Sequence, residues 1–82
     1  MDKVTVLYFA GARDAAGVKS DTVEVDGAST ASDVLRRIIK MHPGLGPMKG
    51  SVRLTVNKEV VAAAARVEPG DEVGVLPPVA GG

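Results

Sequence analysis

One amphipathic stretch, set between runs of alternating residues, constrains the fold of this sequence more than any other feature. Apolar residues recur there with the 3.6-residue period of an α-helix, and basic residues fill the opposite side. The apolar stripe is Ala31, Val34, Leu35, Ile38 and Ile39, and the polar side is Arg36, Arg37 and Lys40. Ser29 or Thr30 can cap the first turn, and Asp33 places negative charge beside its positive end. The pattern predicts a helix that begins near residue 31 and ends at Pro43-Gly44.

Five runs are predicted to be β-strands. They are Val4–Ala10, Asp21–Asp26, Ser51–Asn57, Glu59–Ala62 and Glu72–Leu76. In the first run apolar side chains alternate onto both faces, so alternation alone does not decide which face is buried. Residues 11–17 lack strand character and hold two glycines. The first two runs are therefore expected to form a hairpin with a long connection.

Short local signals predict the remaining connections. Asn57-Lys58 favours the tight turn of a hairpin, because Asn tolerates the left-handed backbone conformation. Glu68-Pro69-Gly70-Asp71 has Pro and Gly in the preferred positions of a type II turn. We expect residues 43–50 to form a loop and the alanine run 62–65 to be a connector, since four alanines are too few for a stable helix.

The predicted order is ββαβββ, with strand pairs on either side of one helix. This order implies an α+β fold in which the helix lies across one face of a small mixed sheet. A β-grasp, the ubiquitin-like fold, is the leading candidate. We expect one β-grasp domain over residues 1–76 and an extended Gly-Gly tail over residues 77–82, because Pro77-Pro78 cannot continue the ladder of the last strand.

Composition argues against several classes of function. Ten basic and ten acidic side chains cancel, and Tyr8 and Phe9 are the only aromatic residues, so a nucleic-acid partner is not expected. The chain has no cysteine, which excludes disulfides and a cysteine nucleophile. No apolar stretch is long enough for a signal peptide or a membrane span. These features predict a soluble protein in the cytoplasm.

The usual catalytic sets are also missing. The single histidine, His42, is expected at the helix end in a structural role, and one histidine is a poor metal site. The carboxylates fall mostly in turns and first helical turns, where acids are favoured for local reasons. Asp33 is spaced to pair with Arg37 at i,i+4. A self-contained active site is therefore not predicted.

The tail from Pro77 to Gly82 is the remaining candidate for chemistry. Pro77 and Pro78 stiffen the exit from the sheet, and the two glycines carry no side chain, so a narrow channel in another protein could grip their backbone. A carboxylate on Gly82 is a poor acyl donor until a partner joins it to AMP by using ATP. Displacement of AMP by sulfur would give a thiocarboxylate, and displacement by a lysine would give an isopeptide conjugate. A tail without chemistry is the third alternative.

The sequence resembles the small subunits of molybdopterin synthase, a family of ubiquitin-like sulfur carriers. Four segments carry the resemblance: Val6-Leu7-Tyr8-Phe9-Ala10 with Arg13-Asp14 and Gly17, Val56-Asn57, Gly70-Asp71-Glu72-Val73, and Pro77-Pro78-Val79-Ala80-Gly81-Gly82. The resemblance implies that an E1-like enzyme adenylates Gly82 and that sulfur is loaded there as a thiocarboxylate. A large synthase subunit would then use this sulfur to build the molybdopterin dithiolene, in a heterotetramer. The chain would bind no cofactor itself.

The same resemblance implies which residues touch these partners. An apolar patch maps onto Phe9, Val60 and Leu76, with Arg13 as a polar contact near it. The tail residues Pro77, Pro78, Val79, Ala80 and Gly81 would enter the partner's channel. Ordinary core packing is the alternative for the three apolar residues, and a burial measurement distinguishes the two. A carrier for thiamin thiazole synthesis, a lysine-linked modifier and an interaction module remain the alternative functions.

Overall fold

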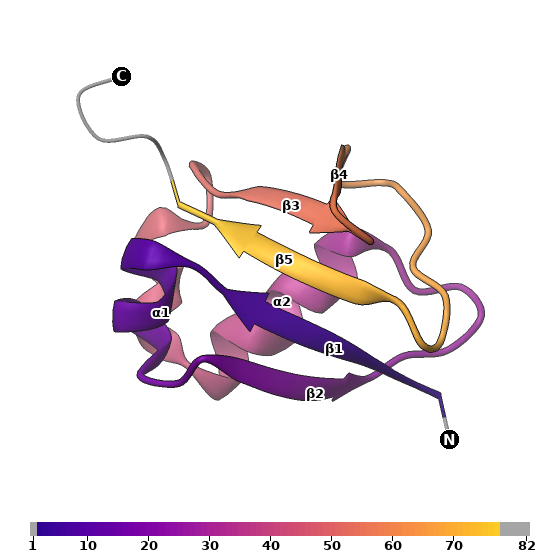
Figure 1. The fold of residues 1–82 in the computed structure, drawn as a ribbon, viewed down its shortest axis with the longest axis horizontal. Helices are drawn as coiled ribbons and strands as arrows, with labels where there is room; N and C mark the ends of the chain where they lie inside the picture. Colours follow the sequence, from indigo (N-terminus) through magenta and orange to yellow (C-terminus); the bar gives the residue numbers. More distant parts are fainter. Residues whose placement is uncertain (1, 78–82) are drawn as a thin grey trace.

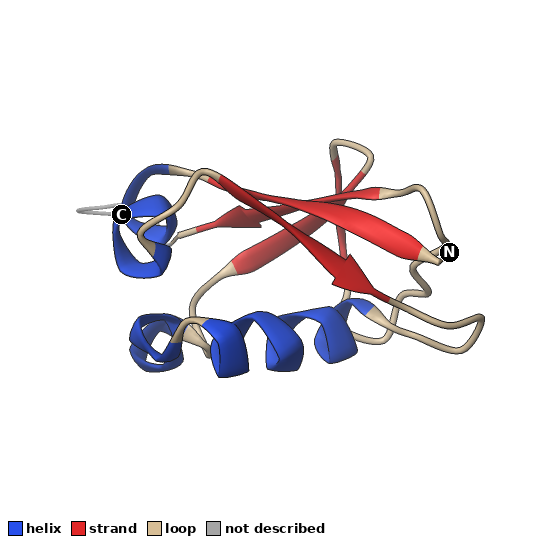
Figure 2. Ribbon diagram, turned by 90° about the horizontal axis from the view of Figure 1, so that it is seen from below, coloured by secondary structure: helices blue, strands red, loops and turns tan. Residues whose placement is uncertain are grey.

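A five-stranded mixed sheet, covered on one face by one long helix, forms the body of the protein (Figures 1 and 2). The structure is a computed structural model, and it describes residues 2–77. The elements in chain order are β1 (Lys3–Tyr8), α1 (Ala10–Ala16), β2 (Ser20–Glu24), α2 (Ala31–Met41), the 3-10 helix η1 (Pro43–Met48), β3 (Arg53–Val56), β4 (Glu59–Val61) and β5 (Glu72–Leu76).

The strands lie in the order β2-β1-β5-β3-β4. β1 and β5 are parallel at the centre of the sheet, and the other pairs are antiparallel. Figure 2 shows α2 running beneath the sheet, with the opposite face of the sheet uncovered by a helix. The α+β class, the single main helix and the β-grasp arrangement are confirmed.

Helix α2 begins where its local sequence predicts. Thr30 is the N-cap: its hydroxyl accepts the Asp33 backbone N–H at 3.2 Å, and the Asp33 carboxylate accepts the Thr30 N–H at 3.0 Å. The next two backbone N–H groups of the helix donate to the carbonyls of Ala65 and Ala63, both at 2.9 Å. The predicted ion pair of Asp33 is wrong in one detail, because Asp33 pairs with Arg36 at i,i+3 rather than with Arg37.

The core lies between α2 and the inner face of the sheet. Its buried apolar side chains are Val4, Val6, Tyr8, Ala12, Val23, Val25, Ala31, Val34, Ile38, Leu45, Leu54, Val67, Val73 and Val75. Leu35 and Ile39 of the predicted helical stripe pack at its margin and are partly buried. The inner face of β1 is therefore the one with Val4, Val6 and Tyr8, and the outer face is the one with Thr5 and Leu7.

The connection between β1 and β2 differs from the prediction. The hairpin is confirmed, but its connection contains helix α1, and β1 ends at Tyr8 rather than at Ala10. Gly17 stops α1 in the left-handed conformation, with φ of 79°, and donates its N–H to the Arg13 carbonyl. A seven-residue helix is too short to be stable by itself, so its stability comes from packing of the fully buried Ala12.

Other local predictions can be compared directly with the backbone. Asn57 and Lys58 have φ of 51° and 75°, the positive values that the predicted tight hairpin turn requires. Gly70 has φ of 91°, and the Asp71 N–H donates to the Glu68 carbonyl at 3.0 Å, as a type II turn requires. Residues 43–48 form η1 rather than a loop, with Pro43 in its first turn. No helix within residues 2–77 is long and apolar enough to cross a membrane.

Candidate functional site

The predicted tail begins where β5 ends. β5 is held between β1 and β3 and ends at Leu76, as predicted (Figure 1). Pro77 is the last residue that the structure describes. The predicted reactive residue Gly82 and the predicted contacts Pro78, Val79, Ala80 and Gly81 lie outside the described residues. Their roles therefore stay predictions.

The start of α1 lines the point at which the chain leaves β5. The N–H of Phe9, the N-cap of α1, donates to the Val75 carbonyl at 3.2 Å. A Cβ built on Gly11 would lie 3.9 Å from the Cβ of Pro77, an ordinary van der Waals contact. The α1 segment and the end of β5 are therefore in direct contact.

The predicted apolar residues lie on the outer face of the sheet. Phe9 is 39% exposed and Val60 is 59% exposed, whereas Leu76 is partly buried. Strand register places one row across the whole sheet: Ser20, Leu7, Gly74, Thr55 and Val60 occupy neighbouring positions. Leu76 follows Gly74 on the same face. Phe9 and Val60 are therefore surface residues rather than core residues, and we call Phe9, Val60 and Leu76 the outer apolar patch.

Gly74 determines where the Phe9 ring sits. A Cβ on Gly74 would lie 3.2 Å from Cε2 of Phe9 and inside the contact distance of the Thr55 hydroxyl. The ring thus covers a position at which β5 has no side chain. The sequence did not identify Gly74 as part of this site. The one available signal was the presence of a glycine inside a predicted strand, which often marks the close approach of another group.

Arg13 lies on α1 with an exposed side chain, four residues after Phe9. Its backbone N–H donates to the Phe9 carbonyl at 3.4 Å. Its side chain lines a shallow hollow together with Asp14 and Lys19. Arg13 is therefore exposed and lies near Phe9 in the chain, and its role as a polar contact with a partner stays a prediction.

A polar cluster that the sequence did not reveal lies at the other side of β1. The Tyr8 hydroxyl donates to Oδ2 of Asp21 at 2.9 Å, and Nε2 of His42 lies 2.6 Å from the same oxygen. The Tyr8 and His42 rings meet edge to face at 5.8 Å. Burial, followed by the bond to Asp21, raises the pKa of Tyr8 well above its usual range, so the phenol stays neutral at physiological pH.

This cluster ties β1, β2 and the end of α2 together and offers no activated nucleophile. The structural role expected for His42 agrees with these contacts. Among residues 2–77 no group of three His, Asp or Glu side chains could hold a metal ion.

Residues 6–82 match the ThiS family. The chain belongs to this family. It is 35% identical over 83 residues to the molybdopterin synthase sulfur carrier subunit of Homo sapiens, an alignment that covers 98% of this chain and 94% of that protein. It is also 32% identical over 82 residues to small archaeal modifier protein 1 of Haloferax volcanii, covering 90% of this chain and 94% of the relative.

Solved structures have the same fold. The crystal structure of SAMP1 from Haloferax volcanii superposes with a TM-score of 0.86 at 30% identity and covers 98% of this chain and 99% of its own. A chain from the complex of subunits 1 and 2 of molybdopterin-converting factor from Helicobacter pylori matches with a TM-score of 0.70 at 21% identity. That match covers 98% of this chain and 99% of the other, and it shows the fold alone.

Proposed function

We propose that this protein is a sulfur carrier and the small subunit of a molybdopterin synthase. The observation that carries the proposal is the ThiS family match through residue 82, together with full-length similarity to a sulfur carrier subunit. The working group is the carboxylate of Gly82. Residues 1–76 are the domain that presents it, residues 77–82 are the tail, and the partners meet it in the cytoplasm.

The chemistry needs an activating enzyme. A carboxylate oxygen of Gly82 attacks the α-phosphate of ATP, pyrophosphate leaves, and an acyl-adenylate forms. A sulfur nucleophile supplied by that enzyme system then displaces AMP and leaves a thiocarboxylate. In the synthase, this sulfur would form a bond to the pterin precursor, and hydrolysis of its bond to the Gly82 carbonyl carbon would restore the carboxylate. A second loaded carrier would supply the other sulfur of the dithiolene. The carrier itself supplies no acid or base in these steps.

The outer apolar patch is the proposed contact with the large subunit and with the activating enzyme. Exposed Phe9 and Val60, with partly buried Leu76 next to Pro77, form an apolar area on the outer face of the sheet. Arg13 would add a polar contact next to it. Because the outer apolar patch includes the residue next to Pro77, each enzyme in turn could bind the folded domain while the enzyme's channel holds residues 77–81.

Reconstitution with the large subunit tests this function. Carrier prepared with a thiocarboxylate at Gly82 should convert the pterin precursor to the dithiolene product, whereas the carboxylate form should not. Replacing Phe9 by Ser should weaken binding to the large subunit without unfolding the domain, because the ring is partly exposed. An active carboxylate form would exclude the proposed role of the thiocarboxylate.

Similarity to small archaeal modifier protein 1 favours a second candidate, a modifier conjugated to lysines. The same acyl-adenylate would then be attacked by a lysine amine to give an isopeptide bond. Denaturing gels distinguish the two functions. Covalent adducts that disappear when Gly82 is deleted indicate conjugation, and thiocarboxylate formation without such adducts indicates sulfur transfer.

A further inference from the structure

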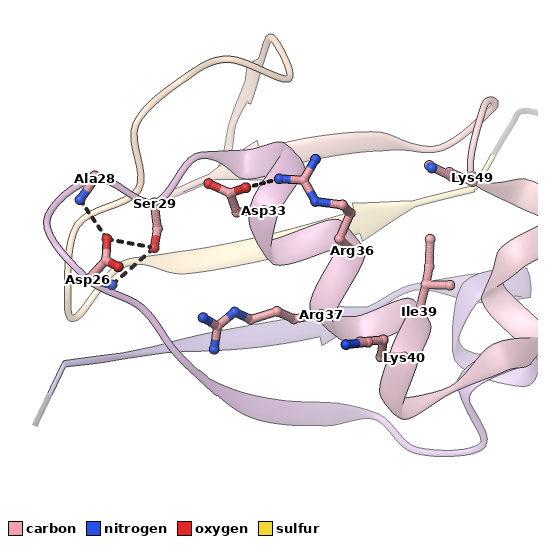
Figure 3. A pocket seen from close by; sticks show the side chains of 9 residues that line it. All are labelled: Asp26, Ala28, Ser29, Asp33, Arg36, Arg37, Ile39, Lys40 and Lys49. Carbon is pink, nitrogen blue, oxygen red and sulfur yellow. Dashed lines mark hydrogen bonds and ion pairs between the residues drawn. The ribbon is translucent and has the colours of Figure 1, made fainter.

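The solvent side of α2 holds a hollow of about 640 Å³ that the proposed function does not use (Figure 3). Its lining residues are Asp26, Ala28, Ser29, Asp33, Arg36, Arg37, Ile39, Lys40 and Lys49. Because α2 covers the inner face of the sheet, this hollow and the outer apolar patch lie on opposite sides of the molecule. One can be occupied while the other is covered.

The two carboxylates of the hollow are already engaged in local structure. Oδ1 of Asp26 accepts the backbone N–H of Ala28 at 2.8 Å and the Ser29 hydroxyl at 3.4 Å. Asp33 accepts two hydrogen bonds from Thr30 and pairs with Arg36. Figure 3 shows Asp26 turned toward Ala28 and Ser29, and Asp33 turned toward Arg36. They hold a turn and a helix cap, and among the described residues neither forms an ion pair with Arg37, Lys40 or Lys49.

The remaining cations have no such partner. The exposed side chains of Arg37, Lys40 and Lys49 make no hydrogen bond or ion pair within residues 2–77. Four basic and two acidic side chains line the hollow, so two positive charges are in excess on a chain whose formal net charge is zero. Arg37 and Lys40 also border a second hollow of about 450 Å³ beside β2. Arg37, Lys40 and Lys49 therefore form a group of cations on this face, with one acid, Glu24, at the edge of the second hollow.

The arrangement of these groups selects the kind of anion. In Figure 3 the side chains of Arg37 and Lys40 lie along one side of the hollow, and Lys49 lies at its far end. Ile39, partly buried, supplies an apolar surface between them. A single phosphate is best held by convergent donors, and a single-stranded nucleic acid by aromatic stacking groups, whereas spaced cations around an apolar centre suit an acidic peptide segment.

We propose that this face of α2 docks an acidic segment of a partner protein, one with carboxylates on either side of an apolar side chain. The surface is separate from the outer apolar patch and does not depend on the chemistry proposed for Gly82. Charged contacts at such a surface contribute mainly to the association rate and to specificity, so binding should weaken with salt.

The test uses a defined peptide and the full chain. Acetyl-Glu-Glu-Leu-Glu-Glu-amide is titrated into isotopically labelled protein while backbone amide shifts are followed, with the Gln-Gln-Leu-Gln-Gln peptide as control. Saturable shifts are expected in residues 36–40 and at Lys49. The variant Arg37→Glu/Lys40→Glu should raise the Kd about tenfold or more. The variant Lys19→Glu/Lys58→Glu changes the net charge equally at exposed sites elsewhere and should stay within about twofold.

The milder variant Arg37→Gln/Lys40→Gln covers the case in which charge reversal disturbs α2. Deletion of residues 77–82 should leave the peptide Kd unchanged, which keeps this result independent of the sulfur-carrier proposal. Equal binding of the glutamine peptide would overturn the inference. So would shifts spread over all basic residues, or inorganic phosphate producing the same shifts at the same concentration, which would indicate a small-anion site.

Discussion

Replacement of Gly74 by Ala tests whether the outer face of the sheet is packed as the structure describes. The added Cβ would meet the Thr55 hydroxyl inside contact distance and Cε2 of Phe9 at 3.2 Å. Overpacking of this kind costs about 1–3 kcal/mol, and loss of glycine freedom in the unfolded chain offsets about 0.4–1 kcal/mol. We therefore expect Gly74→Ala to lower the free energy of unfolding by about 0.5–2 kcal/mol.

A double-mutant cycle isolates the contact that causes this loss. Thr55→Ala removes the hydroxyl and leaves the close contact with Phe9, so Gly74→Ala in that background should cost clearly less than in the parent. The coupling energy between the two sites is then about 1 kcal/mol or more. Urea unfolding followed by circular dichroism measures the coupling energy. The free energy of unfolding of a domain of this size falls by about 1 kcal/mol per molar urea, so a change of this size shifts the midpoint measurably. Equal effects of Gly74→Ala in both backgrounds would refute the packing of Gly74 against Thr55.

Three further predictions concern the helices. Thr30→Ala should cost about 1 kcal/mol of stability in urea unfolding, because it removes the N-cap of α2, and Thr30→Ser should restore most of it; equal stability of the two variants would contradict the cap. Hydrogen bonds from Thr30 hold the pKa of Asp33 below its ordinary value of 3.8, so its contribution is present above that pH and is lost as the pH falls below it. Asp33→Asn should therefore be less stable than the parent at pH 7, and the difference in stability should shrink as the pH falls. A difference that persists unchanged to pH about 2 would contradict this reasoning. Gly44→Ala would place a Cβ 2.7 Å from the Ala15 carbonyl oxygen and should cost about 1–3 kcal/mol by thermal melting, whereas Gly46→Ala, with nothing within 4 Å, should be nearly neutral.

Structural features that depend on neighbouring residues in the chain could be predicted from the sequence. The cap of α2, its apolar stripe and its end near residue 42 depend on residues within a few positions of one another. The turns at Asn57-Lys58 and at Gly70 depend on two or three residues with characteristic backbone preferences. The order of elements along the chain, with strands on both sides of one main helix, indicated the α+β class and made the β-grasp the leading candidate.

Structural features that depend on tertiary packing could not be predicted from the sequence. Helix α1 is short and contains Gly11, so local propensity alone does not favour it, although alanines followed by Gly17 were a usable signal. The cluster of Tyr8, Asp21 and His42 joins residues as far as 34 positions apart in the chain, and no periodic pattern in the sequence predicts it.

The roles of the candidate site residues stay predictions. Its residues came from a resemblance, and the structure adds that Phe9 and Val60 are exposed and that Leu76 is only partly buried. Alternation could not choose between the two apolar faces of β1; packing of α2 against Val4 and Val6 makes that choice. The role of Gly74 depends on two neighbouring strands and could not be seen in the sequence of β5 alone.

Intact mass of the chain after incubation with an E1-like activating enzyme, ATP and a sulfur donor tests the central claim most directly. Exchange of one carboxylate oxygen for sulfur predicts a gain of about 16 Da that maps to Gly82. The gain should require ATP and should be absent when Gly82 is deleted, although the deletion variant keeps its fold. An unchanged mass under conditions in which the enzyme loads a known carrier would contradict the account.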